Sequence, residues 1–79
     1  MKIPRSVNGR DLANYLIRTW SFREVRQTGS HIILRSDIPV DHSVSVPAHK
    51  PVKTGTLKSI IAYVATHKGV TVADILRDL

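Results

Sequence analysis

Two segments of the chain carry apolar residues at spacings of three and four, which is the period of an α-helix. In the first segment, which follows Asn8, the residues Leu12, Tyr15 and Leu16 share one helical face. The second segment starts near Thr54 and fills the template i, i+3, i+4, i+7, i+8 with Leu57, Ile60, Ile61, Val64 and Ala65. Both segments are therefore predicted to form amphipathic helices that bury one face.

Capping signals mark where these helices begin and end. Asn8 is a favoured N-cap residue, and Asp11 stands where its carboxylate can reach back to the cap. Gly69 is suited to the left-handed residue that ends the second helix. Thr71 then caps a short third helix, with Asp74 at the matching position of a capping box.

Alternating apolar and polar residues between the two long helices predict three strands, over residues 23–27, 30–36 and 42–47. The stretch from Ala48 to Lys53 is predicted to be a loop. The order of elements is then α-β-β-β-α, followed by a short terminal helix. A three-stranded antiparallel sheet needs one face covered, and two amphipathic helices supply that cover. We therefore predict one two-layer α+β domain over residues 1–79.

The first two strands are predicted to form a hairpin with Thr28-Gly29 as a two-residue turn. This register pairs Val25 with Ile32, and it also pairs Gln27 with Ser30 and Arg26 with His31. Because threonine is poorly suited to positive φ, a longer loop with Gly29 as its left-handed residue stays open. That alternative shifts the register by one residue.

Composition adds a strong positive charge to this picture. Twelve Lys and Arg against six Asp and Glu give a net charge of +6, and the pI is about 10.4. Such a charge favours polyanions and points to nucleic acid, with solubility alone as the alternative. The chain has no cysteine, which excludes disulfides and thiolate metal sites. The apolar runs are too short for a membrane span and the start lacks an apolar signal segment, so we expect a cytoplasmic location and no membrane partner.

His31 is the sharpest candidate for chemistry. Ile32 and Leu34 point to one face of their strand, so the odd-numbered residues, His31 among them, point to the face that the helices leave open. An exposed imidazole titrates near neutral pH and can both accept and donate a proton. Cleavage of RNA through its own 2′-hydroxyl needs such a group. A lone histidine at the end of a strand is also commonly an ordinary surface residue.

Several side chains around His31 are candidates for RNA contacts. Arg26 is its cross-strand neighbour in the predicted register, and Arg35 shares its face. Turn residues can serve the turn alone, and each lysine or arginine alone can be a solvated charge. His49 has three possible roles, as a second proton-transfer group, a phosphate contact or a group that fixes its loop. The candidates are Arg26, Gly29, Ser30, Arg35, His49, Lys50, Lys53 and Lys58.

A metal site is the rival interpretation for four histidines. His42 and His49 are separated by a strand and a turn, and no spacing with a carboxylate resembles a known ligand motif. We interpret His67 as a charge at a helix end and His42 as a surface residue at the start of a strand. The sequence therefore predicts no metal and no other cofactor.

Four short motifs stand in a fixed order along the chain. They are Asn8-Gly9-Arg10-Asp11-Leu12, Gly29-Ser30-His31, Val46-Pro47-Ala48-His49, and Gly55-Thr56-Leu57 followed by Ile60. In this order and in a basic chain of this length, they resemble the HicA family of toxins, small bacterial and archaeal ribonucleases that cleave messenger RNA. One departure is Ser21, where the family often has glycine.

The resemblance implies more than a fold. It implies a double-stranded-RNA-binding-domain-like architecture, a catalytic histidine at His31, mRNA as the substrate, and a HicB-like antitoxin that binds the toxin and suppresses it. Two other classes stay open on the residues alone. One is a non-catalytic RNA-binding module that uses the same basic surface. The other is a regulatory protein whose basic face meets an acidic protein.

Overall fold

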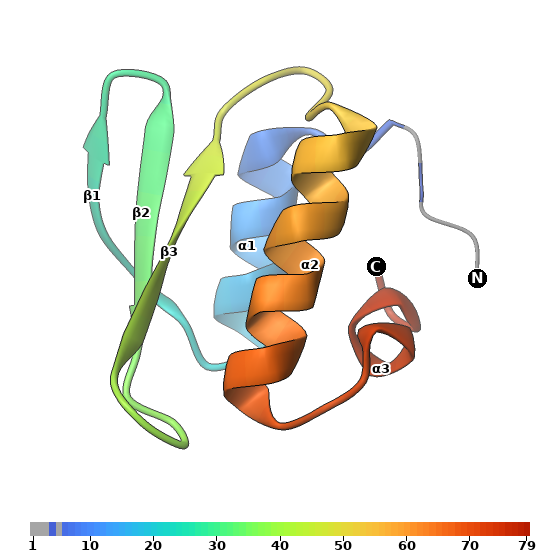
Figure 1. Ribbon diagram of the computed structural model, residues 1–79. Helices are drawn as coiled ribbons and strands as arrows, with labels where there is room; N and C mark the ends of the chain where they lie inside the picture. Colours follow the sequence, from blue (N-terminus) through green and yellow to red (C-terminus); the bar gives the residue numbers. More distant parts are fainter. Residues whose placement is uncertain (1–3, 5) are drawn as a thin grey trace.

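A computed structural model describes residue 4 and residues 6–79. The elements are α1 (Gly9–Thr19), β1 (Arg23–Thr28), β2 (His31–Ser36), β3 (His42–Pro47), α2 (Thr54–Lys68) and α3 (Val72–Leu76). The strands form one antiparallel sheet in the order β1-β2-β3. Figure 1 shows α1 and α2 side by side on one face of this sheet, with α3 packed beside α2. This is the predicted α+β arrangement, and it fits a double-stranded-RNA-binding-domain-like fold.

The core lies between the sheet and the two long helices. Ile32 and Leu34 of β2 and Val46 of β3 are fully buried. The helices contribute the predicted apolar faces, namely Leu12, Tyr15, Leu16, Leu57, Ile60, Ile61, Val64 and Ala65. Full burial of one large aliphatic side chain contributes about 1.5–3 kcal/mol, so this shared core holds the two layers together. Within the described part of the chain, no helix has the length and apolar character needed to cross a membrane.

The ends of α2 and α3 follow the sequence prediction. Gly69 adopts a left-handed conformation with φ of 70° directly after α2. At α3 the capping box is complete, because the Asp74 N–H donates to the Thr71 hydroxyl over 3.1 Å and the Thr71 N–H donates to the Asp74 carboxylate over 3.0 Å. These hydrogen bonds lower the pKa of Asp74. A bond from Tyr15 to the carbonyl of Ile75, 2.6 Å long, joins α3 to α1.

The start of α1 is held differently from the prediction. Asn8 is the N-cap residue, but its side chain makes no capping hydrogen bond within the described residues, and Asp11 does not complete a capping box. The N–H of Gly9 instead donates to the backbone carbonyl of His49 over 2.9 Å. Because a loop distant in sequence satisfies this N–H, the helix start depends on tertiary structure.

The predicted turn of the hairpin is wrong by one residue. Thr28 pairs with His31, so the turn consists of Gly29 and Ser30. Gly29 has φ of 58°, and positive φ at the first turn position is what a type II′ turn requires. The first strand therefore ends one residue later than predicted, and the second strand begins one residue later.

The predicted hairpin pairs are wrong for the same reason. Gln27, not Val25, lies opposite Ile32, and Arg26 lies opposite Ile33 rather than opposite the histidine. A bulge between Glu24 and Arg26 takes Val25 out of the ladder, where its side chain is 48% exposed. Arg26 still shares the face of His31, since it pairs with an odd-numbered residue of β2.

The prediction that His42 lies on the surface is wrong. It is 7% exposed and lies on the face of β3 that also carries the buried Val46. Its ring meets the ring of Phe22 edge-on at 5.3 Å and stacks on His67 at 5.2 Å. Its Nδ1 lies 2.6 Å from the carbonyl oxygen of Val40, and its Nε2 has no partner among the described residues. His42 is a core residue, away from any open surface.

The connection from α1 to β1 runs through a strained position. Ser21 has φ of 62°, in the left-handed region, where a side chain costs about 1–2 kcal/mol. This is the position at which the HicA pattern often has glycine. The departure from that pattern is thus accommodated by strain in the backbone rather than by a different turn.

Candidate functional site

His31 begins the central strand and projects from the face turned away from the helices. Its paired neighbours are Thr28 on β1 and Pro47 on β3, so strands flank its backbone on both sides. The side chain is exposed, whereas the adjacent Ile32 is fully buried on the other face. The orientation predicted from alternation is confirmed. A paired backbone with an open imidazole can present a proton-transfer group in a fixed place.

The loop after β3 is fastened beside His31 by backbone hydrogen bonds. The N–H of Ala48 donates to the carbonyl of Ser30 in the hairpin turn over 2.6 Å. The carbonyl of His49 accepts the bond from Gly9 described above, which ties the loop to the start of α1. The His49 side chain is exposed. Structure therefore brings the hairpin turn, the His49 loop and the start of α1 together.

The starts of both long helices lie at this same end of the molecule. Figure 1 shows the hairpin turn, the loop between β3 and α2 and the first turns of α1 and α2 at the top of the view. A bond of 2.8 Å from the N–H of Val52 to the carbonyl of Val7 adds a second tie between the loop and the segment before α1. Helix N-termini carry partial positive charge, so two of them here favour an anion.

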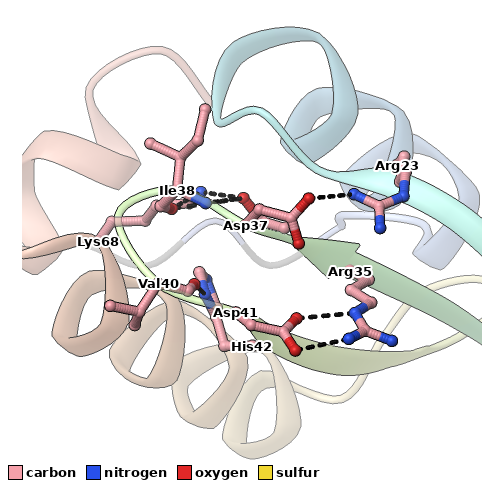
Figure 2. Close-up of polar contacts among 9 residues, drawn as sticks. Arg23, Arg35, Asp37, Ile38, Val40, Asp41, His42 and Lys68 are labelled. Carbon is pink, nitrogen blue, oxygen red and sulfur yellow. Dashed lines mark hydrogen bonds and ion pairs between the residues drawn. The ribbon is translucent and has the colours of Figure 1, made fainter.

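At the opposite end, the loop between β2 and β3 neutralises two arginines. Figure 2 shows the Arg35 guanidinium donating two bonds to the Asp41 carboxylate, 2.7 and 2.5 Å long, and Arg23 reaching Asp37 at 3.2 Å. The bonds from Arg35 lower the pKa of Asp41 and raise the pKa of Arg35. Lys68 closes this loop by donating to the carbonyl of Ile38 over 2.5 Å. Arg35 thus shares the face of His31 but is bonded to a carboxylate.

A third ion pair crosses from α1 to the sheet. Arg10 donates to Glu24 over 2.7 Å and to Gln27 over 3.2 Å. The hydrogen bond from Arg10 lowers the pKa of Glu24. Glu24 and Gln27 lie on the helix side of β1, because each pairs with a core residue of β2. This contact holds α1 against β1 and occupies both polar side chains.

The remaining candidates form a group that we call the basic end. These are Arg26 on β1, Lys50 and Lys53 in the loop after β3, and Lys58 in α2. All four are exposed, and none makes an ion pair with the residues that the structure describes. Arg10, Arg23, Arg35 and Arg77 are paired with carboxylates, whereas these four cations lie on the elements that meet at the end of the molecule carrying His31 and His49.

Gly9 lies in the contact between the start of α1 and the loop after β3, and the sequence analysis did not single it out as a candidate. A Cβ built at this position would lie 1.8 Å from the carbonyl oxygen of Pro47 and 2.8 Å from the Cα of Ala48. Only glycine therefore allows the helix start to approach the loop this closely. The available signal was its place in the first motif, at the first position of a helix.

Metal chemistry has no cluster to support it in the described chain. Among residue 4 and residues 6–79, no group of three or more His, Asp or Glu side chains is arranged to hold a metal ion. His42, one of the two histidines weighed as ligands, lies in the core between aromatic rings.

Comparison with known families gives one finding. A family model described as the HicA toxin of bacterial toxin–antitoxin systems matches residues 9–65, which is most of the chain. The matched range includes His31, the basic end and Gly9, and it stops before α3. No curated protein and no solved structure matches.

Proposed function

We propose that this chain, which belongs to the HicA family of toxins from bacterial toxin–antitoxin systems, is a metal-independent endoribonuclease that cleaves mRNA with His31. The observation that carries the proposal is the place of His31. Its imidazole projects from a strand that is paired on both sides, next to a group of cations without carboxylate partners in the described chain. A cytoplasmic location belongs to the proposal, since mRNA is the substrate.

The chemistry needs one proton acceptor and a positive surface. The neutral imidazole of His31 takes the proton of a 2′-hydroxyl, and the resulting oxygen attacks the adjacent phosphorus. The bond from phosphorus to the 5′-oxygen breaks, and that oxygen takes a proton from the imidazolium or from water. The products are a 2′,3′-cyclic phosphate and a 5′-hydroxyl. Cations of the basic end stabilise the charge that develops on the phosphoryl oxygens.

A HicB-like antitoxin is the second partner in this proposal. A protein that covers the open face of the sheet around His31 would exclude RNA without changing the fold of the toxin. Because the neighbouring side chains are basic, the covering surface would carry acidic side chains at its rim.

The test is a cleavage assay on an RNA and on DNA of the same sequence. We expect cleavage of the RNA only, undiminished by a strong chelator, with cyclic phosphate or 3′-phosphate ends on the products. Activity that is lost with chelator and restored by a divalent metal would contradict the mechanism. Binding without cleavage would favour an RNA-binding module, and neither binding nor cleavage would favour a protein-interaction role.

Since Arg35 is paired with a carboxylate and the lysines of the basic end are not, we predict that the lysines contact RNA and that Arg35 does not. Lys53→Ala should weaken binding to all RNA sequences alike and reduce the slope of log K against log salt by roughly 0.7 for a single strand. The matched control is the double variant Arg35→Ala/Asp41→Ala, which removes a bonded pair and leaves the net charge unchanged. Its affinity should stay within about twofold of the wild type, as salt titrations can show. Equal losses of RNA affinity in the two variants would contradict this assignment of the RNA contacts.

A further inference from the structure

We propose that Arg26 is a second catalytic residue, whose guanidinium binds the non-bridging oxygens of the scissile phosphate while His31 takes the proton of the 2′-hydroxyl. This inference rests on the proposed ribonuclease function and deepens it, because it assigns one cation of the basic end to the reacting atoms. The register of the hairpin and the bulge in β1 carry the assignment.

Arg26 lies on the open face of the sheet as a diagonal neighbour of His31. Thr28 pairs with His31 and Arg26 pairs with Ile33, so the two side chains leave the same face from adjacent strands. Diagonal neighbours of this kind lie roughly 7–8 Å apart, a distance that long side chains can bridge. A ribose and its 3′-phosphate between them can therefore present the 2′-hydroxyl to the imidazole and the phosphate to the guanidinium.

The bulge in β1 keeps a carboxylate away from Arg26. If the pairing continued from the turn without a bulge, Glu24 would lie opposite Arg35, on the open face and beside Arg26. Instead Glu24 pairs with Leu34, points to the helix side and accepts a bond of 2.7 Å from Arg10. Bulges next to active sites often re-aim a side chain in this way. Arg26 is left exposed on the open face, without an ion pair to any residue that the structure describes.

A fixed backbone and a planar donor group distinguish Arg26 from the lysines of the basic end. Arg26 belongs to a paired strand, whereas Lys50 and Lys53 lie in the loop after β3 and Lys58 lies in α2, in the other layer. A guanidinium can donate two parallel N–H bonds to a phosphate, whereas an ammonium binds it as a point charge. Donors aimed at oxygens that gain charge stabilise the transition state, so this contact should raise kcat. Arg26 keeps its protons throughout, and the proton transfers stay with the imidazole.

The experiment measures kcat and KM for RNA cleavage by Arg26→Gln and Arg26→Lys in the full chain. Loss of a donor to a developing oxyanion costs about 10²–10³-fold, so kcat of Arg26→Gln should fall by that factor while KM changes little. Arg26→Lys keeps the charge but loses one of the two bonds, so its kcat should stay at least about tenfold below the wild type.

Arg23→Gln is the matched control. Arg23 lies on the same strand and the same face, since it pairs with Arg35, and its replacement removes the same charge. It is bonded to Asp37 at 3.2 Å, toward the end of the strand away from the hairpin turn. Its kcat should stay within about twofold of the wild type.

Sulfur substitution at the scissile phosphate gives a readout that a merely structural role of Arg26 would not change. Sulfur is a poor hydrogen-bond acceptor, so the wild type should cleave one phosphorothioate diastereomer at least about tenfold more slowly than the unmodified RNA. In Arg26→Gln the same substitution should have almost no further effect, because both changes remove the same hydrogen bonds.

Each outcome separates this inference from the function on which it rests. A loss in Arg26→Gln that is confined to KM, or equal falls of kcat in Arg26→Gln and Arg23→Gln, would overturn the role of Arg26 and leave the ribonuclease intact. An equal sulfur effect in the wild type and in Arg26→Gln would overturn it as well. Failure of the wild-type chain to cleave RNA would overturn the proposed function itself.

Discussion

Replacement of His31 with alanine should abolish RNA cleavage and leave the fold intact. The imidazole is exposed on the open face of β2, so its removal costs little packing. A positioned general base contributes about 10²–10⁴-fold to a rate, and kcat should fall by that factor. The kcat of His31→Gln should fall by the same factor, because an amide keeps much of the shape of the imidazole but cannot accept the proton. Rates of cleavage, circular dichroism and the melting temperature would be measured together.

Ser43→Ala is the matched control for this variant. Ser43 lies on the same open face, opposite Arg35 and distant from the basic end. The Ser43→Ala variant should retain wild-type activity and stability. That result would show that truncating a side chain on this face is harmless by itself. If His31→Ala retains more than about a tenth of the wild-type rate, the assignment of His31 as the general base is wrong.

The face of the sheet to which His31 points could be predicted from the sequence, because it depends on one local rule. Successive side chains of a strand point to opposite faces, and the neighbours Ile32 and Leu34 are both apolar. The same rule, applied to β3, would have placed His42 correctly. It shares a face with Val44 and Val46, so it had to point toward the helices. The surface position was predicted from the polar character of His42 and its place at the start of a strand, whereas the alternation of side chains predicts the buried position that the structure shows.

The dipeptide at the turn is a signal for the observed hairpin register. Gly29-Ser30 is a dipeptide suited to a type II′ turn, with glycine where φ is positive. Thr28-Gly29 would instead place threonine in that conformation. The preference for pairing Val25 with Ile32 on the core face misled the prediction. In the structure a bulge removes Val25 from the ladder, and no pattern in the sequence announces that bulge.

The ion pairs were not predictable from spacing. Arg10 and Glu24 come from a helix and a strand, and they meet only because α1 packs beside β1. Arg35 and Asp41 lie on a strand and the loop that follows it, so their contact depends on how that loop returns. The sequence therefore gives the number of charges, but only the tertiary structure shows which cations have a carboxylate partner.

The second large effect is expected at Gly9, far from the proton transfer itself. In Gly9→Ala the new methyl group would meet the carbonyl oxygen of Pro47 at 1.8 Å, and the three nearest atoms, from Pro47 and Ala48, all belong to the backbone. The start of α1 and the loop after β3 would have to separate, and the bond from Gly9 to His49 would be lost. Overpacking of this kind costs about 1–3 kcal/mol or more. In a chain of this size, the melting temperature should fall by roughly 4–8 °C per kcal/mol.

Cleavage by Gly9→Ala should also decrease at temperatures where the variant is folded. The loop that moves carries His49 and Lys50, so the cations beside His31 lose their fixed place. Gly9 acts here as a positioning residue, and the expected signature is weaker RNA binding with a reduced salt dependence. Unchanged affinity in the folded variant would show that the loop does not contribute to RNA binding.

Gly55→Ala is the control that separates this contact from the effect of any glycine. Gly55 also lies in the first turn of a helix, and a Cβ there has no atom within 4 Å among the described residues. Alanine favours a helix over glycine by about 0.5–1 kcal/mol, so Gly55→Ala should raise the melting temperature. Intrinsic helix propensity alone would predict the same gain for Gly9→Ala. If the melting temperature falls in Gly9→Ala and rises in Gly55→Ala, the loss of stability comes from the close approach of α1 and the His49 loop. A change in the same direction in both variants would refute this explanation.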